Sequence, residues 1–597
     1  MAQLVDSTIS INGTPISQFS SFTLSQGIFE HHTFRLICPA ESVDGTSGVF
    51  TSSRDMMGAT LTVQIKADDL SGAQLKFSGV VTQVETARFG SYHGDVVISG
   101  FSPTIVLDSG PHCKSWEKKA VKNIAQDVLK FFPQNLLNPK VAPLYPETLA
   151  YTVQYKETAW QFLQRLCATY GEWFFYDGQK LIVGPPAASE KASLVFGSNL
   201  SRFNMALQVR PADMQIMAWD YMNSEVYTSS PDGIENKAGL NDLGKHVLQA
   251  SRTVYGSQPK SWNNHFLTNK KQLDDVVNIR SAMRSSSHVR FNGNSGHPGV
   301  ALGGQVEVSG NNAFDASSEA YGEFTVIAAN HFVDGQGNYN NDFVAIPASI
   351  KLPPVSPFPE PHCETQSAIV TDNNDPRGIG RVRVKYHWMN GAEKSPWIRV
   401  TTPHAGGGKG MYFIPEVGEE IISGFEGDSA IKPYVVGAVY HSKANNAFGN
   451  AGNDVKALQS RSGNKVVLND KDGSVFIEDQ NGNNILIDGK GNLNVFSKET
   501  MTFTCGEDGL SVITMKKDGT IDIMGKNVTI VGTESVTAAS GSESSNSGFT
   551  VVPDSVDVLG KQSVNIMGET ETNVTGGTIT VAASGDTNVQ GAKVNIN

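Results

Sequence analysis

Apolar and polar residues alternate along much of the first 110 residues. The stretch LTVQIK (61–66) places leucine, valine and isoleucine on one side of an extended chain, which is the pattern of a half-buried β-strand. The stretch GDVVISGFS (94–102) is a second apolar run that follows after a loop. These patterns predict that the chain begins with a strand-rich domain.

Three later segments repeat apolar residues every three or four positions instead, which is typical of amphipathic helices. They are 115–132, 156–171 and 270–284, and the second ends at Gly171, where a C-cap glycine belongs. The stretch that follows, EWFFYDGQKLIVG, predicts a hairpin around an Asp-Gly turn, with its aromatic run packed in a core. The predicted inward faces of the helices are Trp116, Ala120, Ile124, Val128 and Phe131; Trp160, Leu163, Cys167 and Tyr170; and Leu273, Val276, Val277 and Met283.

Proline marks the next change along the chain. The segment 351–363 contains five prolines, which exclude a helix or a central strand and predict a linker between domains. The region 379–441 then alternates short apolar runs with glycine and proline turns, which is typical of a small closed barrel such as an OB-fold. The predicted strands are 380–388, 396–403, 410–415, 419–426 and 433–441.

The last segment, from about 456 onward, has no helical pattern and repeats a motif in which two apolar residues flank a polar one. From Val558 to Ile596 the second apolar member recurs every seven or eight residues, which is an internal repeat. Because alternate residues of a strand face opposite sides, each motif should bury one side and expose the other. The predicted core positions are Ile521, Ile523, Val528, Ile530, Val556, Val558, Val564, Ile566, Ile579 and Val581.

A three-residue strand followed by a short corner is the rung of a β-helix. One chain turning this often would enclose almost no core and would leave its edges unpaired. Three chains wound together would supply both the core and the edge partners, so we predict an intertwined homotrimeric needle. The alternative is a flat array of meandering hairpins in one chain. Residues 539–554 interrupt the repeat and are predicted to form a loop, whereas 463–520 predict hairpins around Asn-Gly and Lys-Gly turns.

Composition and charge argue against several classes of protein. Acidic residues outnumber lysine and arginine by 59 to 47, giving a formal net charge of −12, which argues against a dedicated nucleic-acid binder. No run of 18 apolar residues predicts a membrane-spanning helix, and the N-terminus lacks the basic start and apolar core of a secretory signal. The five cysteines are scattered, so neither a disulfide framework nor a thiolate metal site is expected. We expect synthesis in a reducing cytoplasm without a signal peptide.

No constellation of catalytic residues stands out in the sequence. G-x-S-x-G and H-E-x-x-H are absent, and PHAGGGKGM (403–411) lacks the spacing and the following helix of a phosphate-binding loop. Asp522 and Asp557 are candidates for the paired carboxylates of a polysaccharide-acting β-helix enzyme, but the polar pattern around them indicates a solvated face. We therefore predict no enzyme activity, no cofactor, no metal site and no nucleic-acid partner.

The predicted OB region carries a resemblance to a known family. DPRGIGRVRVKYHW, followed by GMYFIPEVGEE and PYVVGAVYH, resembles the OB domain of VgrG, the spike family of type VI secretion systems. Residues 155–184 resemble the helix and hairpin of the family's N-terminal domain, and the C-terminal repeat resembles its needle. The resemblance implies a mainly β, multidomain fold. It would comprise a phage-hub-like domain at 1–365, with two tube-like barrels and a helical insert around 113–171, an OB-fold neck at 366–445 and an intertwined trimeric β-helix at 446–597.

The resemblance also implies partners and a mechanical role. A homotrimeric spike of this family mates with a hexameric Hcp-like tube protein and baseplate components, and a PAAR-repeat protein caps its tip. After ejection by the contractile apparatus it punctures the target-cell membrane and delivers effector toxins. Because the last repeat ends one residue before the end of the sequence, we expect toxins to ride non-covalently. The alternative is the spike of a phage tail or of an extracellular contractile injection particle. The predicted cap-binding tip is Val594, Asn595, Ile596 and Asn597.

Overall fold

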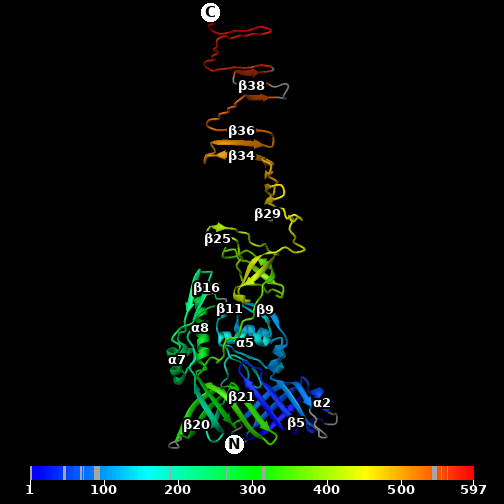
Figure 1. Ribbon diagram of the computed structural model, residues 1–597, viewed down its shortest axis with the longest axis vertical. Helices are drawn as coiled ribbons and strands as arrows, with labels where there is room; N and C mark the ends of the chain where they lie inside the picture. Colours follow the sequence, from blue (N-terminus) through cyan, green and yellow to red (C-terminus); the bar gives the residue numbers. More distant parts are fainter. Residues whose placement is uncertain are drawn as a thin grey trace. The chain divides into compact units, whose positions relative to one another are not determined.

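The computed structural model divides the chain into two compact units, Met1–Ala444 and Asn445–Asn597 (Figure 1). The structure describes residues 3–44, 49–67, 70, 73–86, 94–187, 190–263, 267, 269–311, 317–540, 547–552, 554–560 and 562–596.

One 14-stranded sheet is the largest element of the first unit. Its N-terminal strands curl around a core that contains Phe22, Leu36 and Phe77, and strands from 192–347 curl around a second core. The main path across the sheet is β15 (Leu200–Leu207), β19 (Val289–Ser295), β22 (Asn338–Pro347), β21 (Ser318–Asp334), β4 (Ser21–Gly27), β5 (Thr33–Pro39), β8 (Asp95–Phe101), β7 (Gln74–Thr86), β6 (Thr60–Lys66), β2 (Asp6–Ile11) and β3 (Thr14–Pro15). Off this path, β1 (Gln3–Leu4) pairs with β22, and β20 (Gln305–Asn311) pairs with β14 (Ala192–Val195) and β21.

The 17-residue strand β21 joins the two halves of this sheet. It pairs with β20 and β22 in one half and with β4 in the other, where Ala328 lies opposite Gly27 and Asp334 lies opposite Ser21. Figure 1 shows the blue and green halves meeting beside β21. The two barrel-like halves therefore share one continuous hydrogen-bonded wall.

The predicted helix at 115–132 is wrong over its first part. Residues His112–Ala120 form strand β9, which pairs along its length with β11 (Thr148–Glu157), and the helix α3 covers only Val121–Leu129. Pairing with β11 overrides the helical spacing, because local periodicity is a weaker determinant than the tertiary contacts of a segment. Phe131, predicted to face inward, lies beyond the helix and is exposed.

The other two predicted helices are confirmed. Helix α5 (Ala159–Tyr170) begins with a capping box between Thr158 and Gln161 and ends at Gly171, whose φ of 72° is the left-handed conformation that glycine tolerates. Helix α8 (Lys270–Ser285) buries its predicted apolar face. The predicted hairpin also forms, from β12 (Phe174–Tyr176) and β13 (Leu181–Val183). The described part of the unit also contains the α-helices α1 (Glu41–Asp44), α2 (Val49–Met56), α4 (Gln134–Leu137), α6 (Ile234–Ala238) and α7 (Asp242–Val254), and the 3-10 helices η1 (Pro103–Asp108) and η2 (Glu426–Asp428).

The proline-rich segment 351–363 contains no helix or strand and packs against the first unit's core, where the Phe358 ring stacks on Phe29 at 5.9 Å between centroids. The OB region (366–441) follows with a four-stranded sheet in the order β24 (Arg383–Tyr386), β23 (Gln366–Asp372), β27 (Glu420–Phe425) and β28 (Pro433–Ala438). Two predicted strands are wrong. Residues 396–403 form single bridges only. Of 410–415 only Gly410 lies in a strand, at the end of a small hairpin of β25 (Ala405–Gly406) and β26 (Lys409–Gly410).

The second unit consists of antiparallel meanders as far as Leu559. The first sheet contains β29 (Val455–Gln459), β30 (Lys465–Asn469), β31 (Ser474–Glu478), β32 (Asn484–Ile487) and β33 (Leu493–Phe496). The second contains β34 (Thr500–Cys505), β35 (Ser511–Lys516) and β36 (Ile521–Met524), and the third contains β37 (Val536–Ser540), β38 (Ser547–Val552) and β39 (Ser555–Leu559). Beyond β39 the described residues contain no strand.

The predicted Asn-Gly and Lys-Gly hairpins are present and share one turn chemistry. Asp479 accepts hydrogen bonds from the backbone and side-chain nitrogens of Asn483, and Asp488 does the same with Asn492. The loop predicted at 539–554 is wrong where β38 pairs with β37 and β39. Residues 541–546 and 553 of that segment lie outside the described residues.

Candidate functional site

The predicted core positions of the C-terminal repeat are exposed in the single chain. Ile521 is 64% exposed, Ile566 70% and Val581 74%, and the other predicted core residues are exposed as well. The polar residues between them are also exposed, because each meander is one sheet thick and has no second layer. Exposed apolar surfaces of this extent commonly mark interaction sites.

Some of these positions pair with apolar residues outside the predicted set. Ile523 lies opposite Ile513 in the pair β35–β36, and Val558 lies opposite Phe549 in the pair β38–β39. Among the described strands, no ladder pairs one repeat motif with another, and Val528, Ile530, Val564, Ile566, Ile579 and Val581 lie outside strands. Up to Leu559 a single chain therefore adopts the hairpin arrangement that was the alternative prediction.

The predicted tip is equally bare. Ile596 is 89% exposed, and Val594 and Asn595 are also exposed. Asn597 lies outside the described residues.

Among the sheet edges that lack a strand partner in the described part of the first unit are those of β15 and β7. Along its length β15 has one strand partner, β19, and its Met205 and Leu207 side chains are exposed. From Gln83 to Thr86 the strand β7 pairs with β8 on one side only. Open edges of this length are templates for strands of another chain.

The core of the OB region is completed by a strand from outside it. Tyr151, Val153 and Tyr155 of β11 pack in one buried cluster with OB residues that include Val384 and Tyr386. The amide of Gln366 donates to the Tyr155 hydroxyl at 2.9 Å. Because side chains of β11 pack inside the OB core, the two parts of the first unit cannot separate without exposing apolar surface on both.

Ion pairs reinforce this junction. Arg383 of the OB sheet pairs with Glu117 of β9, and Lys156 at the end of β11 pairs with Glu364. The hydrogen bond from Lys156 lowers the pKa of Glu364 to about 2, so the pair stays ionised in all but strong acid.

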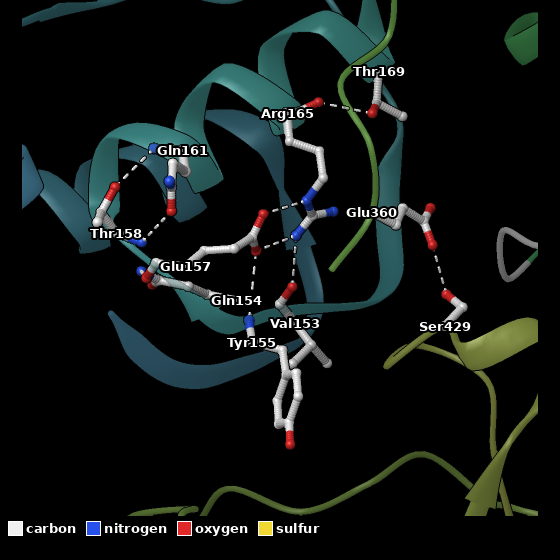
Figure 2. Close-up of polar contacts among 10 residues, drawn as sticks. All are labelled: Val153, Gln154, Tyr155, Glu157, Thr158, Gln161, Arg165, Thr169, Glu360 and Ser429. Atoms are coloured by element: carbon white, nitrogen blue, oxygen red, sulfur yellow. Dashed lines mark hydrogen bonds and ion pairs between the residues drawn. The ribbon is translucent and has the colours of Figure 1, made fainter. Parts of the chain in front are cut away.

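A buried pair anchors the same end of β11, at its last residue, Glu157 (Figure 2). Arg165 of helix α5 binds both carboxylate oxygens of Glu157 at 2.7 Å and donates to the carbonyl of Val153 at 2.9 Å. Figure 2 also shows Glu360, which accepts from the Ser429 hydroxyl at 2.8 Å and so ties the proline-rich segment to the OB region. These side chains position elements relative to one another.

Groups that could perform chemistry are sparse. Among the described residues, no cluster of three or more His, Cys, Asp and Glu side chains could hold a metal ion. No helix in the described part of the chain is long and apolar enough to cross a bilayer. The expected absence of a cofactor and of a nucleic-acid partner stays a prediction.

Two family models match this chain in the order of its domains. The phage tail baseplate hub model matches 42–337, and the type VI secretion system/phage-baseplate injector OB domain model matches 366–440. The chain belongs to the family of VgrG spikes and phage tail hubs. The predicted fold class, a mainly β multidomain chain with a phage-hub-like part and an OB domain, is therefore confirmed.

Curated VgrG spikes align with different shares of the chain. VgrG4b of Pseudomonas aeruginosa is 39% identical over 122 residues, which is 18% of this chain and 15% of that protein. VgrG1a of the same organism is 21% identical over 488 residues, which is 71% of this chain and 70% of that protein. Both are named type VI secretion system spike proteins. A Francisella PdpA–VgrG complex shares the fold, with a TM-score of 0.53, 7% identity and coverage of 83% of this chain and 80% of that one.

The contact between β11 and the OB core is the part that sequence reasoning missed. The alternation in YTVQYKE (151–157) indicates a strand, but the residues that it contacts lie more than 200 positions later. No local signal links β11 to the OB core. The predicted domain boundaries and the predicted core and tip residues stay predictions.

Proposed function

We propose that three copies of this chain form the membrane-puncturing spike of a contractile type VI secretion machine. The exposed apolar repeat of the C-terminal unit carries this proposal. Burying a valine or isoleucine side chain stabilises a fold by about 1.5–3 kcal/mol. Because these side chains are exposed in a single chain, burying them between chains would add a large stabilisation. Three wound copies would stack these side chains on a common axis and leave the polar positions in water.

The open edges of β15 and β7 support the proposal that copies of the chain form a ring through their hub parts. Copies that met edge to edge would pair both strands and close the sheet. Such a ring of paired barrels is suited to a hexameric Hcp-like tube protein, because each copy contributes two similar halves. In this proposal the hub is 1–365, the OB neck 366–445 and the needle 446–597.

The remaining partners follow from the family. The proposed tip, Val594 to Asn597, would bind a PAAR-repeat cap, baseplate components would hold the hub, and effector toxins would be carried non-covalently. The spike would be made in the cytoplasm without a signal peptide, assembled on the apparatus and ejected. Its role would be mechanical, with no reaction catalysed.

The native mass of the full chain tests the proposal, measured by light scattering on a size-exclusion column. A mass near three chains is expected. A monomer would contradict the wound needle and would leave the single-chain meander as the functional form. The genes beside this one separate the secretion spike from a phage tail or an extracellular particle, because only the first requires a membrane-anchoring complex.

A further inference from the structure

A cleft of about 490 Å³ opens in the first unit beside the OB sheet. One wall is the end of β16 (Gln215–Asp220), which contributes Trp219, and the turn that leads to β17 (Glu225–Ser229), which contributes Tyr221. The facing wall is the OB region, which contributes Trp397 and Arg399. The Arg399 guanidinium lies over the Tyr221 ring at 4.6 Å, so the two walls already touch at one point.

The cleft is positively charged although the chain as a whole carries −12. Six cationic and three acidic side chains line it. Arg383 and Arg399 are paired with Glu117 and Glu426, and Arg381 binds Asp375 at 2.7 Å. Two further cations, Lys118 and Arg377, are exposed and have no acidic partner among the described residues.

An apolar sheet face adjoins this cleft. Strands β17, β16 and β18 (Lys260–Trp262) form a small sheet whose inner face, at Ile216 and Ala218, packs with residues of α8. On the outer face Trp219 lies opposite Val226, and Met217 lies opposite Trp262. Trp219 is 41% exposed and Trp262 56%. Exposed tryptophan beside arginine is the composition of energetic anchors at protein interfaces.

We propose that this cleft and the adjoining tryptophan face bind an acidic polypeptide segment that carries aromatic or large aliphatic residues. The uncompensated positive charge selects the acidic partner, and the outer face of β16 receives its apolar side chains. A flat anionic membrane fits less well, because the cations lie between two protein walls rather than on a protruding surface. The site belongs to the first unit and does not depend on the proposed trimeric needle.

The test is the fluorescence anisotropy of a labelled peptide of about 14 residues, mostly glutamate with two phenylalanines, titrated with the full chain. Binding tighter than about 100 µM at 0.1 M salt is expected. The double substitution Lys118→Glu and Arg377→Glu should weaken binding by about tenfold or more, and Trp219→Ala should do the same. Arg202→Glu is the matched control, because Arg202 is exposed, pairs with Asp342 and lies outside the cleft; it should change binding by less than about twofold.

Binding weaker than about 100 µM, or binding that both the charge reversal and Trp219→Ala leave unchanged, would overturn the proposal. Phosphatidylserine vesicles serve as the second probe. Vesicle binding that is lost in the double variant, without peptide binding, would assign the cleft to membranes and would equally overturn it. Circular dichroism of each variant checks the fold, and Trp219→Ala keeps the test decisive if the charge-reversed chain fails to fold.

Discussion

Glu393 of the OB region accepts two hydrogen bonds from Ser115 of strand β9, one from the backbone amide and one from the hydroxyl, both at 3.1 Å. The two residues are 278 positions apart, and Ser115 is buried. One carboxylate thus fastens the OB region to the β9–β11 ribbon by a contact that no local sequence pattern encodes.

Removing this carboxylate should weaken the first unit. Glu393→Ala leaves two buried donors without their charged acceptor, which costs about 1.5–3 kcal/mol. We expect a loss of that size in the free energy of unfolding, measured by urea titration. Lys394→Ala is the control, because Lys394 forms no hydrogen bond or ion pair with the described residues. An equal effect of the two substitutions would contradict the role given to Glu393.

The buried ion pair of Arg165 and Glu157 should stabilise the fold more than an exposed ion pair does. Arg165→Met leaves the carboxylate buried and unpaired, and breaking such a pair costs about 3–5 kcal/mol. Lys270→Met removes a more exposed partner of Asp274 and should cost less than about 1 kcal/mol. The thermal unfolding of both variants, followed by calorimetry, compares them directly. A small effect at Arg165 would show that the junction is held by apolar packing alone.

Two buried histidines should make the hub sensitive to acid. The amide of Gln26 links His32 and His331, at 3.2 Å and 3.1 Å, and burial lowers the pKa of both histidines to about 3. The unfolded chain takes up these protons near pH 6.5, whereas the folded chain does so near pH 3. Stability is therefore complete above pH 6.5 and falls as the pH drops through this window, by about 1.4 kcal/mol per pH unit for each histidine.

The substitution His331→Gln should remove one of the two contributions. Urea titrations at pH 7 and pH 5 should show a smaller pH-dependent loss for this variant than for the parent chain, whatever its stability at pH 7. An unchanged loss would mean that other groups dominate the acid response.

The two faces of the repeat should respond oppositely to the same new charge. Ile566→Asp would place three carboxylates on the proposed axis, where each buried charge costs several kcal/mol, whereas Asn565→Asp would face water. Limited proteolysis beyond residue 560 should cleave the first variant and spare the second. Equal cleavage of both would contradict the assigned inward face.

The tip can be tested in the same way. Replacing Val594 and Ile596 with aspartate should abolish co-purification of a PAAR-repeat protein, because an apolar end is converted to a charged one. Asn595→Asp changes the intervening polar position and should retain the cap. Capture of the cap by the doubly substituted chain would place its binding surface elsewhere.

Local signals predicted the elements that depend on local contacts. Helix α5 was predictable because Gln161 and Gly171 supply its ends and its apolar stripe faces a core. The strand His112–Ala120 was not, because its partner β11 lies about 30 residues later and no local pattern specifies it. In the repeat, the pattern shows which side chains are apolar, but no pattern within one chain identifies what covers them.

The pairing of β4 with β21 has a consequence for how the chain is made. Gln26 and His331, which meet in that pairing, are separated by 305 residues. At about 5–20 residues per second, the ribosome finishes β4 roughly 15–60 s before β21 emerges. Throughout that interval the N-terminal strands expose an apolar face and an unpaired edge, so the nascent chain is a natural client for a holding chaperone during translation.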